Sequence, residues 1–158
     1  RENAAQGRRN EAFMALPPSK QRVQIARDVL KWLQVGRLKA QAGVYLYAVV
    51  PGSEFAEYGE DSVKCTACAL GGVFAAAAFR DSSLFERMGS CGPYDLRRAL
   101  GPYFEDRQLV QIEAAFERRA FSHLDQDAED YCPIGMSSRD RMERIMRNII
   151  RNDGTFVP

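Results

Sequence analysis

Two cysteines, Cys65 and Cys68, are the residues whose spacing is most suggestive of chemistry. They stand at the start of an uncharged segment that we expect to be helical, so both thiols would share one face near the positive end of the helix dipole. Such a position lowers a thiol pKa, and the thiolate is the form that attacks electrophiles and binds metals. Free cysteine is also among the residue types most often buried, and we favour that structural interpretation.

The nucleophilic alternative is a cysteine-dependent hydrolase or transferase. Cys68, or else Cys65, would be the nucleophile, with the single histidine, His123, as its base. Asp125 or Asp127 would then orient the imidazole. Papain-like enzymes use these residue types in this order, but the chain lacks the series of strands that delivers the histidine and its orienting residue in those enzymes.

Metal and redox chemistry are further alternatives for the thiols. A zinc site would use all four cysteines of the chain, Cys65, Cys68, Cys91 and Cys132. Structural zinc sites usually bring together two close pairs, whereas the third and fourth cysteines here are single and distant. A thioredoxin-like site needs its pair directly after a strand, and the predicted strand ends about fifteen residues earlier. We therefore expect no cofactor, with zinc as the alternative.

The segment 122–135 is acidic and superficially resembles a calcium loop. Its carboxylates are Asp125, Asp127, Glu129 and Asp130. Asp130 occupies the position where a calcium loop requires glycine, and Met136 stands where the bidentate glutamate is needed. We interpret the segment as an acidic surface that contributes to partner binding.

The last predicted helix carries a row of arginines opposite its apolar stripe. This Arg ridge consists of Arg141 at the edge, Arg144, Arg147 and Arg151. Asp140 and Glu143 each lie four residues before one of these arginines, an arrangement that favours intrahelical ion pairs and partly neutralises the ridge. This neutralisation favours an ordinary solvated helix face. If the ridge is a contact surface, the expected partner is an acidic protein. Nucleic acid is the less favoured alternative, because its recognition needs several unneutralised basic side chains.

Composition is typical of ordinary folded domains. Apolar residues make up 46% and charged residues 27% of the 158 residues, which predicts one domain over 1–158 with one core. The net charge of +1 provides no global field that would attract nucleic acid or a membrane. No uncharged segment is long enough to cross a bilayer, and four scattered cysteines favour a reducing cytoplasm. The chain starts at Arg1, so the presence of a removed leader stays open.

The uncharged segment 65–79 is the centre of the predicted fold. A helix that is apolar on all sides is a buried helix, so we expect others to surround it. The segment 43–50 is rich in β-branched and aromatic residues and ends at a Pro-Gly turn, which predicts a strand with a hairpin partner in 55–58.

Apolar periodicity and capping residues predict the other helices. One runs from Ser19 to Gly36, and a short one ends at Leu100. The others cover 103–121 and run from Ser137 to Asp153. Residues 1–18 are expected to form a loosely docked arm that ends at the Pro17-Pro18 pair. The predicted fold is a mostly α-helical α+β domain with five or six helices around 65–79 and at most a small sheet or hairpin that includes 43–50.

The segments CALGGVFAAAA, residues 68–78, and RMERIMRNIIRNDGTFVP, residues 141–158, resemble small uncharacterised proteins of bacteria and their phages or plasmids. The resemblance implies an accessory gene in a bacterial or phage-infected cell, and it implies no catalytic residues. With the balanced charge and the lack of a cofactor motif, it predicts a non-enzymatic protein that binds a macromolecule, such as an inhibitor of a host defence system acting by occlusion.

Overall fold

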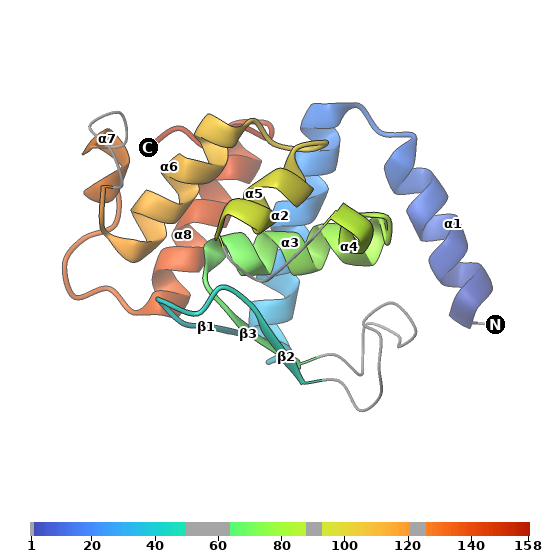
Figure 1. Ribbon diagram of the computed structural model, residues 1–158, viewed down its shortest axis with the longest axis horizontal. Coiled ribbons are helices and arrows are strands. Elements are labelled where there is room, and N and C mark those ends of the chain that lie inside the picture. The colour runs from blue at the N-terminus through green and yellow to red at the C-terminus, as the bar shows by residue number, and fades with distance from the viewer. Residues whose placement is uncertain (1, 50–63, 88–92, 121–125) are drawn as a thin grey trace.

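The computed structural model describes residues 2–49, 64–87, 93–120 and 126–158 (Figure 1). Within these ranges the chain forms eight helices and three strands. The helices are α1 (Glu2–Met14), α2 (Pro18–Gln34), α3 (Ala69–Arg80), α4 (Leu84–Arg87), α5 (Pro93–Leu100), α6 (Asp106–Glu117), α7 (Gln126–Glu129) and α8 (Ser138–Arg151). The strands are β1 (Leu38–Ala40), β2 (Tyr47–Val49) and β3 (Lys64–Ala67). The predicted α-rich α+β fold is confirmed.

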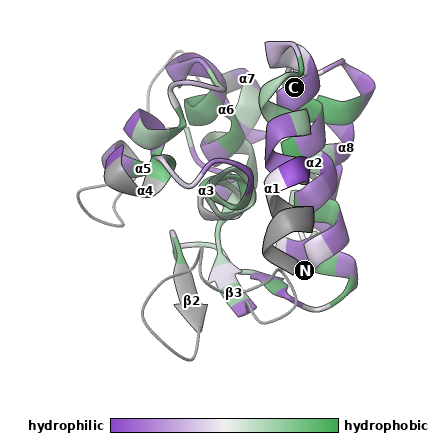
Figure 2. Cartoon of the chain, turned by 90° about the vertical axis from the view of Figure 1, so that its right-hand side faces the viewer, coloured by the Kyte–Doolittle hydropathy of each residue, from purple (hydrophilic) through white to green (hydrophobic). Residues whose placement is uncertain are grey.

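Helix α3 is the buried centre of the molecule, as expected. Every residue from Ala69 to Ala78 is buried, and Figure 2 shows the helix nearly end-on with other helices around it. The prediction that the helix begins at Cys65 is wrong, because residues 64–67 form strand β3 and Cys68 is the N-cap. Pairing with strands on both sides holds this segment extended, which local helix propensity cannot overcome.

The three strands form one small mixed sheet in the order β1-β3-β2. β1 pairs with β3 in parallel, with Leu38 opposite Cys65, and β2 pairs with β3 antiparallel, with Ala48 opposite Cys65. The sheet lies below the helices (Figure 1). The strand predicted over 43–50 is therefore present only as its end, β2, and the hairpin partner predicted over 55–58 lies outside the described residues.

Helix α8 matches its sequence signals at both ends, whereas α2 matches them at its end only. The predicted N-cap of α2, Ser19, is wrong: Pro17 is the N-cap, because proline is tolerated in the first turn of a helix and its fixed φ suits that position. α2 has Pro18 at its first position and is followed by Gly36 with a φ of 77°, a left-handed conformation that glycine adopts without steric cost. At the start of α8, the Ser137 hydroxyl accepts a hydrogen bond from the Asp140 backbone N–H at 3.1 Å. Both helices bury one apolar face, and α2 buries Trp32 almost completely.

Helix α6 is shorter than the predicted 103–121. It begins after Glu105 and ends at Arg118, which adopts a left-handed conformation with a φ of 55°. Tyr103 and Phe104 precede the helix and pack into the core instead of extending it. Helix α6 lies against α3, α7 and α8 and so connects the centre of the fold to its C-terminal part.

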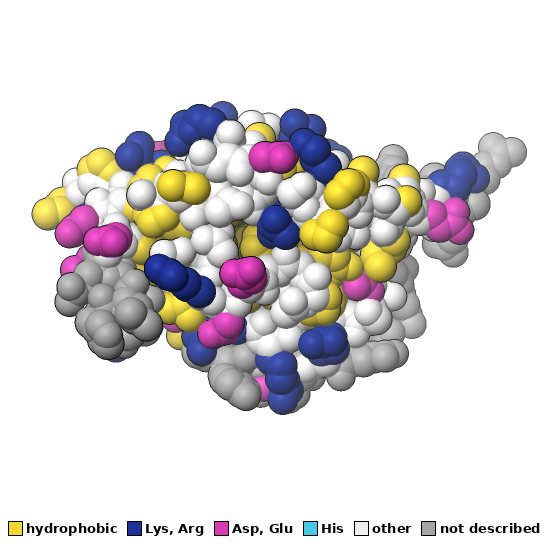
Figure 3. All heavy atoms as spheres, turned by 90° about the horizontal axis from the view of Figure 1, so that it is seen from above, with side chains coloured by type: hydrophobic (Ala, Val, Ile, Leu, Met, Phe, Trp, Pro, Cys, Tyr) yellow, Lys and Arg dark blue, Asp and Glu magenta, His cyan; other side chains and the backbone are white. Residues whose placement is uncertain are grey.

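The segment 1–18, expected as a docked arm, contains helix α1, which extends away from the rest of the chain (Figures 1 and 3). Its C-terminal end is held by Phe13, which is 2% exposed and packs at 5.6 Å from the Tyr103 ring. The Gln21 side chain also donates a hydrogen bond to the Phe13 carbonyl. No helix in the described ranges is long and apolar enough to span a membrane.

A bidentate ion pair joins α2 to the end of α3. Arg80 donates to both carboxylate oxygens of Asp28, at 2.8 and 3.0 Å, and Gln24 donates to the same carboxylate at 2.9 Å. The side chains of Arg80 and Asp28 are only 20% and 11% exposed, so solvent screens the pair weakly.

We expect Asp28→Ala to lower the free energy of unfolding by about 3 kcal/mol, because it leaves the Arg80 charge partly buried without its carboxylate. Urea denaturation followed by circular dichroism measures this. Asp106→Ala is the matched control, since Asp106 pairs with Arg97 but its side chain is 72% exposed. The control should cost less than about 1 kcal/mol. Equal losses of unfolding free energy in the two variants would mean that burial does not strengthen the pair between Arg80 and Asp28.

Candidate functional site

The two cysteines of the Cys-x-x-Cys pair lie on different elements. Cys65 is on β3 and Cys68 caps α3, and they are 4% and 1% exposed. Burial raises the pKa of each thiol from 9.0 to about 12. The backbone N–H groups of Leu70 and Gly71 lower the pKa of Cys68, but desolvation outweighs them. Both cysteines are therefore core residues with almost no thiolate at neutral pH.

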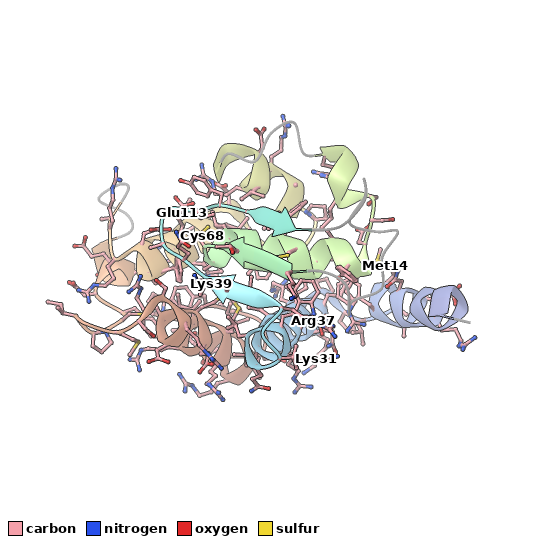
Figure 4. All side chains as sticks on the ribbon, turned by 90° about the horizontal axis from the view of Figure 1, so that it is seen from below. Met14, Lys31, Arg37, Lys39, Cys68 and Glu113 are labelled. Atoms are coloured by element: carbon pink, nitrogen blue, oxygen red, sulfur yellow. The ribbon has the colours of Figure 1, made fainter. Side chains whose placement is uncertain are left out.

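A buried carboxylate next to Cys68 was missed by the sequence analysis. Glu113 on α6 is 3% exposed, and Figure 4 shows it beside Cys68. Its negative charge, with that of Glu117, raises the pKa of Cys68 further. The signal was present, because Glu113 lies on the apolar face of the predicted helix, four residues after Leu109 and three before Phe116. Glu117 also accepts a hydrogen bond from the Gly43 backbone N–H at 3.1 Å.

The partners required by the enzyme and zinc alternatives are only partly described. His123, Asp125 and Cys91 lie outside the described residues. Cys132 is buried, and burial raises its pKa although three nearby arginines oppose the shift. In the described part of the chain, no three His, Cys, Asp or Glu side chains are close enough to hold a metal ion. Among the residues that the structure describes, there is therefore neither an exposed thiol nor a cluster of metal ligands.

Arg141 does not belong to an open basic surface. It donates to the carbonyls of Phe116 and Met136, each at 2.7 Å, and to the Ser138 hydroxyl at 3.2 Å. Its guanidinium also lies over the Phe116 ring, 5.3 Å from the centroid. With these partners, Arg141 fixes the start of α8 against the end of α6, so it is removed from the predicted contact surface.

Arg144 is exposed but held by Tyr131. Its guanidinium stacks on the tyrosine ring at 4.6 Å, and its Nε donates to the Tyr131 carbonyl at 3.2 Å. It takes this position instead of the predicted ion pair with Asp140. The contact gives the surface a planar cation and an aromatic ring in a defined geometry.

The remaining arginines line a groove along α8. This α8 groove has a volume of about 350 Å³ and is lined by Tyr131, Met136, Asp140, Glu143, Arg144, Arg147 and Arg151. The predicted pair between Glu143 and Arg147 is present at a long distance, 3.9 Å, and Glu143 also pairs with Arg139 at 3.2 Å through its other oxygen. Arg151 is exposed, and no ion pair is found for it among the described residues.

Tyr131 and Met136, from the part of the chain between α7 and α8, also line the groove. Ile134, which lies between them in the sequence, is 89% exposed, the most exposed of the large apolar residues described. In the acidic segment, Asp127 and Asp130 are exposed, whereas Glu129 accepts a hydrogen bond from the Ala120 backbone N–H at 3.1 Å and joins α7 to the end of α6.

No protein-family model, curated protein or solved structure matches the chain. Any inference about its function therefore rests on the geometry of the chain itself. That geometry combines two buried thiols before the start of α3 with an open groove that presents two exposed arginines and a stacked Arg-Tyr pair.

Proposed function

We propose that this protein is a non-enzymatic binding protein and that the α8 groove contacts another protein. The observation that carries the proposal is the grouping of the stacked Arg144 and Tyr131 with two further exposed arginines, Arg147 and Arg151, along one groove. Tyrosine and arginine dominate the energetic centres of protein interfaces. Met136, which also lines the groove, supplies an apolar contact, and methionine is enriched in protein interfaces.

The charges of the groove favour an acidic protein segment over a nucleic acid. Arg147 and Arg151 lie one helical turn apart and are both exposed, so a carboxylate can reach either of them. Asp140 and Glu143 also line the groove, and a phosphate backbone would meet these carboxylates along its length. A protein partner can place its acidic side chains selectively, which a uniformly charged backbone cannot do.

Binding of this kind suits an accessory protein that blocks a surface of its partner. The resemblance to small proteins of bacteria and their phages or plasmids supports such a role, in which the protein inhibits a host macromolecule by occlusion. Mass action is sufficient for this mechanism, since an occluding protein needs affinity and no chemistry.

We expect the double variant Arg147→Glu/Arg151→Glu to lower recovery of the bound partner from a host lysate about tenfold, because it places like charges opposite an acidic segment. Quantitative mass spectrometry of affinity-purified complexes measures the recovery. Arg144 is left intact because it packs on Tyr131.

The matched control is Arg27→Glu/Arg107→Glu, which makes the same change in charge at exposed positions of α2 and α6. It should leave recovery unchanged. A partner that is retained by the groove variant, or lost equally from both variants, would exclude the α8 groove as the contact surface.

A further inference from the structure

Residues 155–158, here termed the tail, follow α8 without helix or strand structure, and two amide side chains hold their backbone. Gln108 on α6 accepts from the Phe156 N–H at 2.6 Å and donates to the Phe156 carbonyl at 3.0 Å. Asn148 on α8 accepts from the Val157 N–H at 2.8 Å and donates to the Val157 carbonyl at 2.7 Å. Paired hydrogen bonds of this kind are how proteins bind extended peptides, since they satisfy the peptide backbone without a neighbouring strand.

A buried aromatic side chain anchors the tail. Phe156 is only 2% exposed, and its ring meets the Tyr131 ring edge-on at 5.2 Å. The Tyr131 hydroxyl accepts a hydrogen bond from Asn148 at 3.0 Å, which orients the amide that binds Val157. The cradle, defined as Gln108, Asn148 and the pocket around Phe156, thus recognises both a backbone and one side chain.

A tight turn joins the tail to α8. Asp153 and Gly154 both have positive φ values, 52° and 95°. Gly154 is pressed against α2, where an added Cβ would lie 2.5 Å from the Ser19 carbonyl oxygen, and its own carbonyl accepts from Arg22 at 2.7 Å. The turn that brings the tail back to the cradle of its own chain therefore requires glycine at position 154, because there is no space for a Cβ there.

We infer that the cradle is an exchangeable peptide-binding site and that its second occupant is the tail of another copy of this chain. The complementarity that the site requires is already present, since a second copy supplies the same Phe156 anchor and the same backbone donors and acceptors. In this inference the closed and exchanged forms make the same contacts in the cradle, and the exchanged form gives up the 153–154 turn together with its contacts to Arg22 and Lys20 on α2. Exchange of an identical element between two copies is a low-cost route to a dimer.

The inference uses residues of the cradle and turn, so it does not rest on the proposed function of the α8 groove. Its critical test is Gly154→Ala. Alanine at a φ of 95° and 2.5 Å from Ser19 opposes the closed turn, whereas an opened turn has no such constraint. We expect the full-length variant to form a dimer whose fraction rises with concentration, at a dissociation constant at least about tenfold lower than for the unmodified protein.

Size-exclusion chromatography with light scattering measures the mass, and circular dichroism checks that the variant is folded. An excess of a synthetic peptide with the sequence of residues 152–158 should dissolve the dimer, and the same peptide carrying Phe156→Ala should not. Because Gly154→Ala opposes the closed turn, its dimer competes with a monomer whose tail is undocked. Adding Gln108→Ala should therefore weaken the dimer at least about tenfold, since it removes two of the four backbone hydrogen bonds.

Two results would overturn the inference. One is a folded Gly154→Ala protein that stays monomeric up to about 1 mM, a concentration comparable to that of a tethered segment. The other is a dimer that neither the peptide nor Gln108→Ala affects. If Gly154→Ala fails to fold, fluorescence polarisation of the labelled 152–158 peptide on the unmodified protein decides instead, and absence of binding at millimolar protein rejects the exchange.

Discussion

Gly71→Ala is expected to lower the free energy of unfolding by about 4 kcal/mol or more, enough to prevent stable folding. A Cβ at this position would lie 1.4 Å from the Tyr45 carbonyl oxygen and 2.9 Å from the Ala67 Cβ. The first atom belongs to the backbone of the segment that crosses the start of α3, where Val44 also accepts a hydrogen bond from the Cys68 N–H. Side-chain rotation cannot relieve this overlap, so the segment or the helix must move.

The neighbouring glycine provides the control. At Gly72 an added Cβ would meet flexible side-chain atoms, Leu38 Cδ2 at 3.3 Å and Met142 Sδ at 3.6 Å. The gain of about 1 kcal/mol in helix propensity offsets this mild crowding, so Gly72→Ala should change stability by less than about 1 kcal/mol. Chemical denaturation of both variants tests the difference. A Gly71→Ala protein as stable as Gly72→Ala would mean that the backbone does not approach α3 as closely as described.

Thiol labelling is the second large effect. With a pKa of about 12 instead of 9.0, Cys65 and Cys68 have about a thousandfold less thiolate at neutral pH than an ordinary cysteine. We expect labelling of both residues in the folded protein to be at least that much slower than in denaturant. The sign follows from desolvation, which disfavours the charged form, so labelling should accelerate with rising pH well beyond pH 9.

Peptide mapping by mass spectrometry resolves the modified positions and so separates these two thiols from Cys91, which lies outside the described residues. Fast modification of Cys68 at neutral pH in the folded state would contradict its burial and would restore the cysteine-enzyme hypothesis. If modification is slow in the folded protein and fast only in denaturant, the result supports the interpretation of both cysteines as core residues. It agrees with the proposed binding function, which uses no thiol.

Tyr131 contributes to both the α8 groove and the cradle that holds the tail. One face of its ring stacks on Arg144 in the α8 groove, and its edge contact with Phe156 anchors the tail. A partner that draws Arg144 away from the ring would therefore act on a residue that supports the cradle. Comparing the tail exchange with and without the partner would reveal such coupling as a change in the dimer fraction.

The helices were predictable wherever their signals are local. The capping serine of α8, its apolar stripe and the terminal Asp153-Gly154 pair specify that helix from contacts within a few residues. The same holds for the apolar stripe of α2 and for its end at Gly36, whereas its start was misplaced because Pro18 belongs to the helix instead of ending the preceding segment. The end of α6 was overestimated, because the left-handed residue that ends it is Arg118, which carries no sequence signal for that conformation.

The sheet could not be predicted in the same way. β1 and β3 have three and four residues, too few for a clear alternation, and they pair in parallel across an intervening segment. Cys65 therefore lies in a strand although its neighbours resemble a helix start.

By itself, then, the sequence determined the fold class, the buried α3, the bounds of α8 and the end of α2, because these follow from periodicity and capping over short separations. Only the tertiary structure decided what individual side chains do. It buried the Cys-x-x-Cys pair on two different elements, withdrew Arg141 to a carbonyl 25 residues away and left Arg147 and Arg151 in an open groove. It also held the tail against Gln108, 48 residues earlier. Each of these outcomes depends on contacts between distant segments, whose burial and hydrogen bonding a linear pattern does not contain.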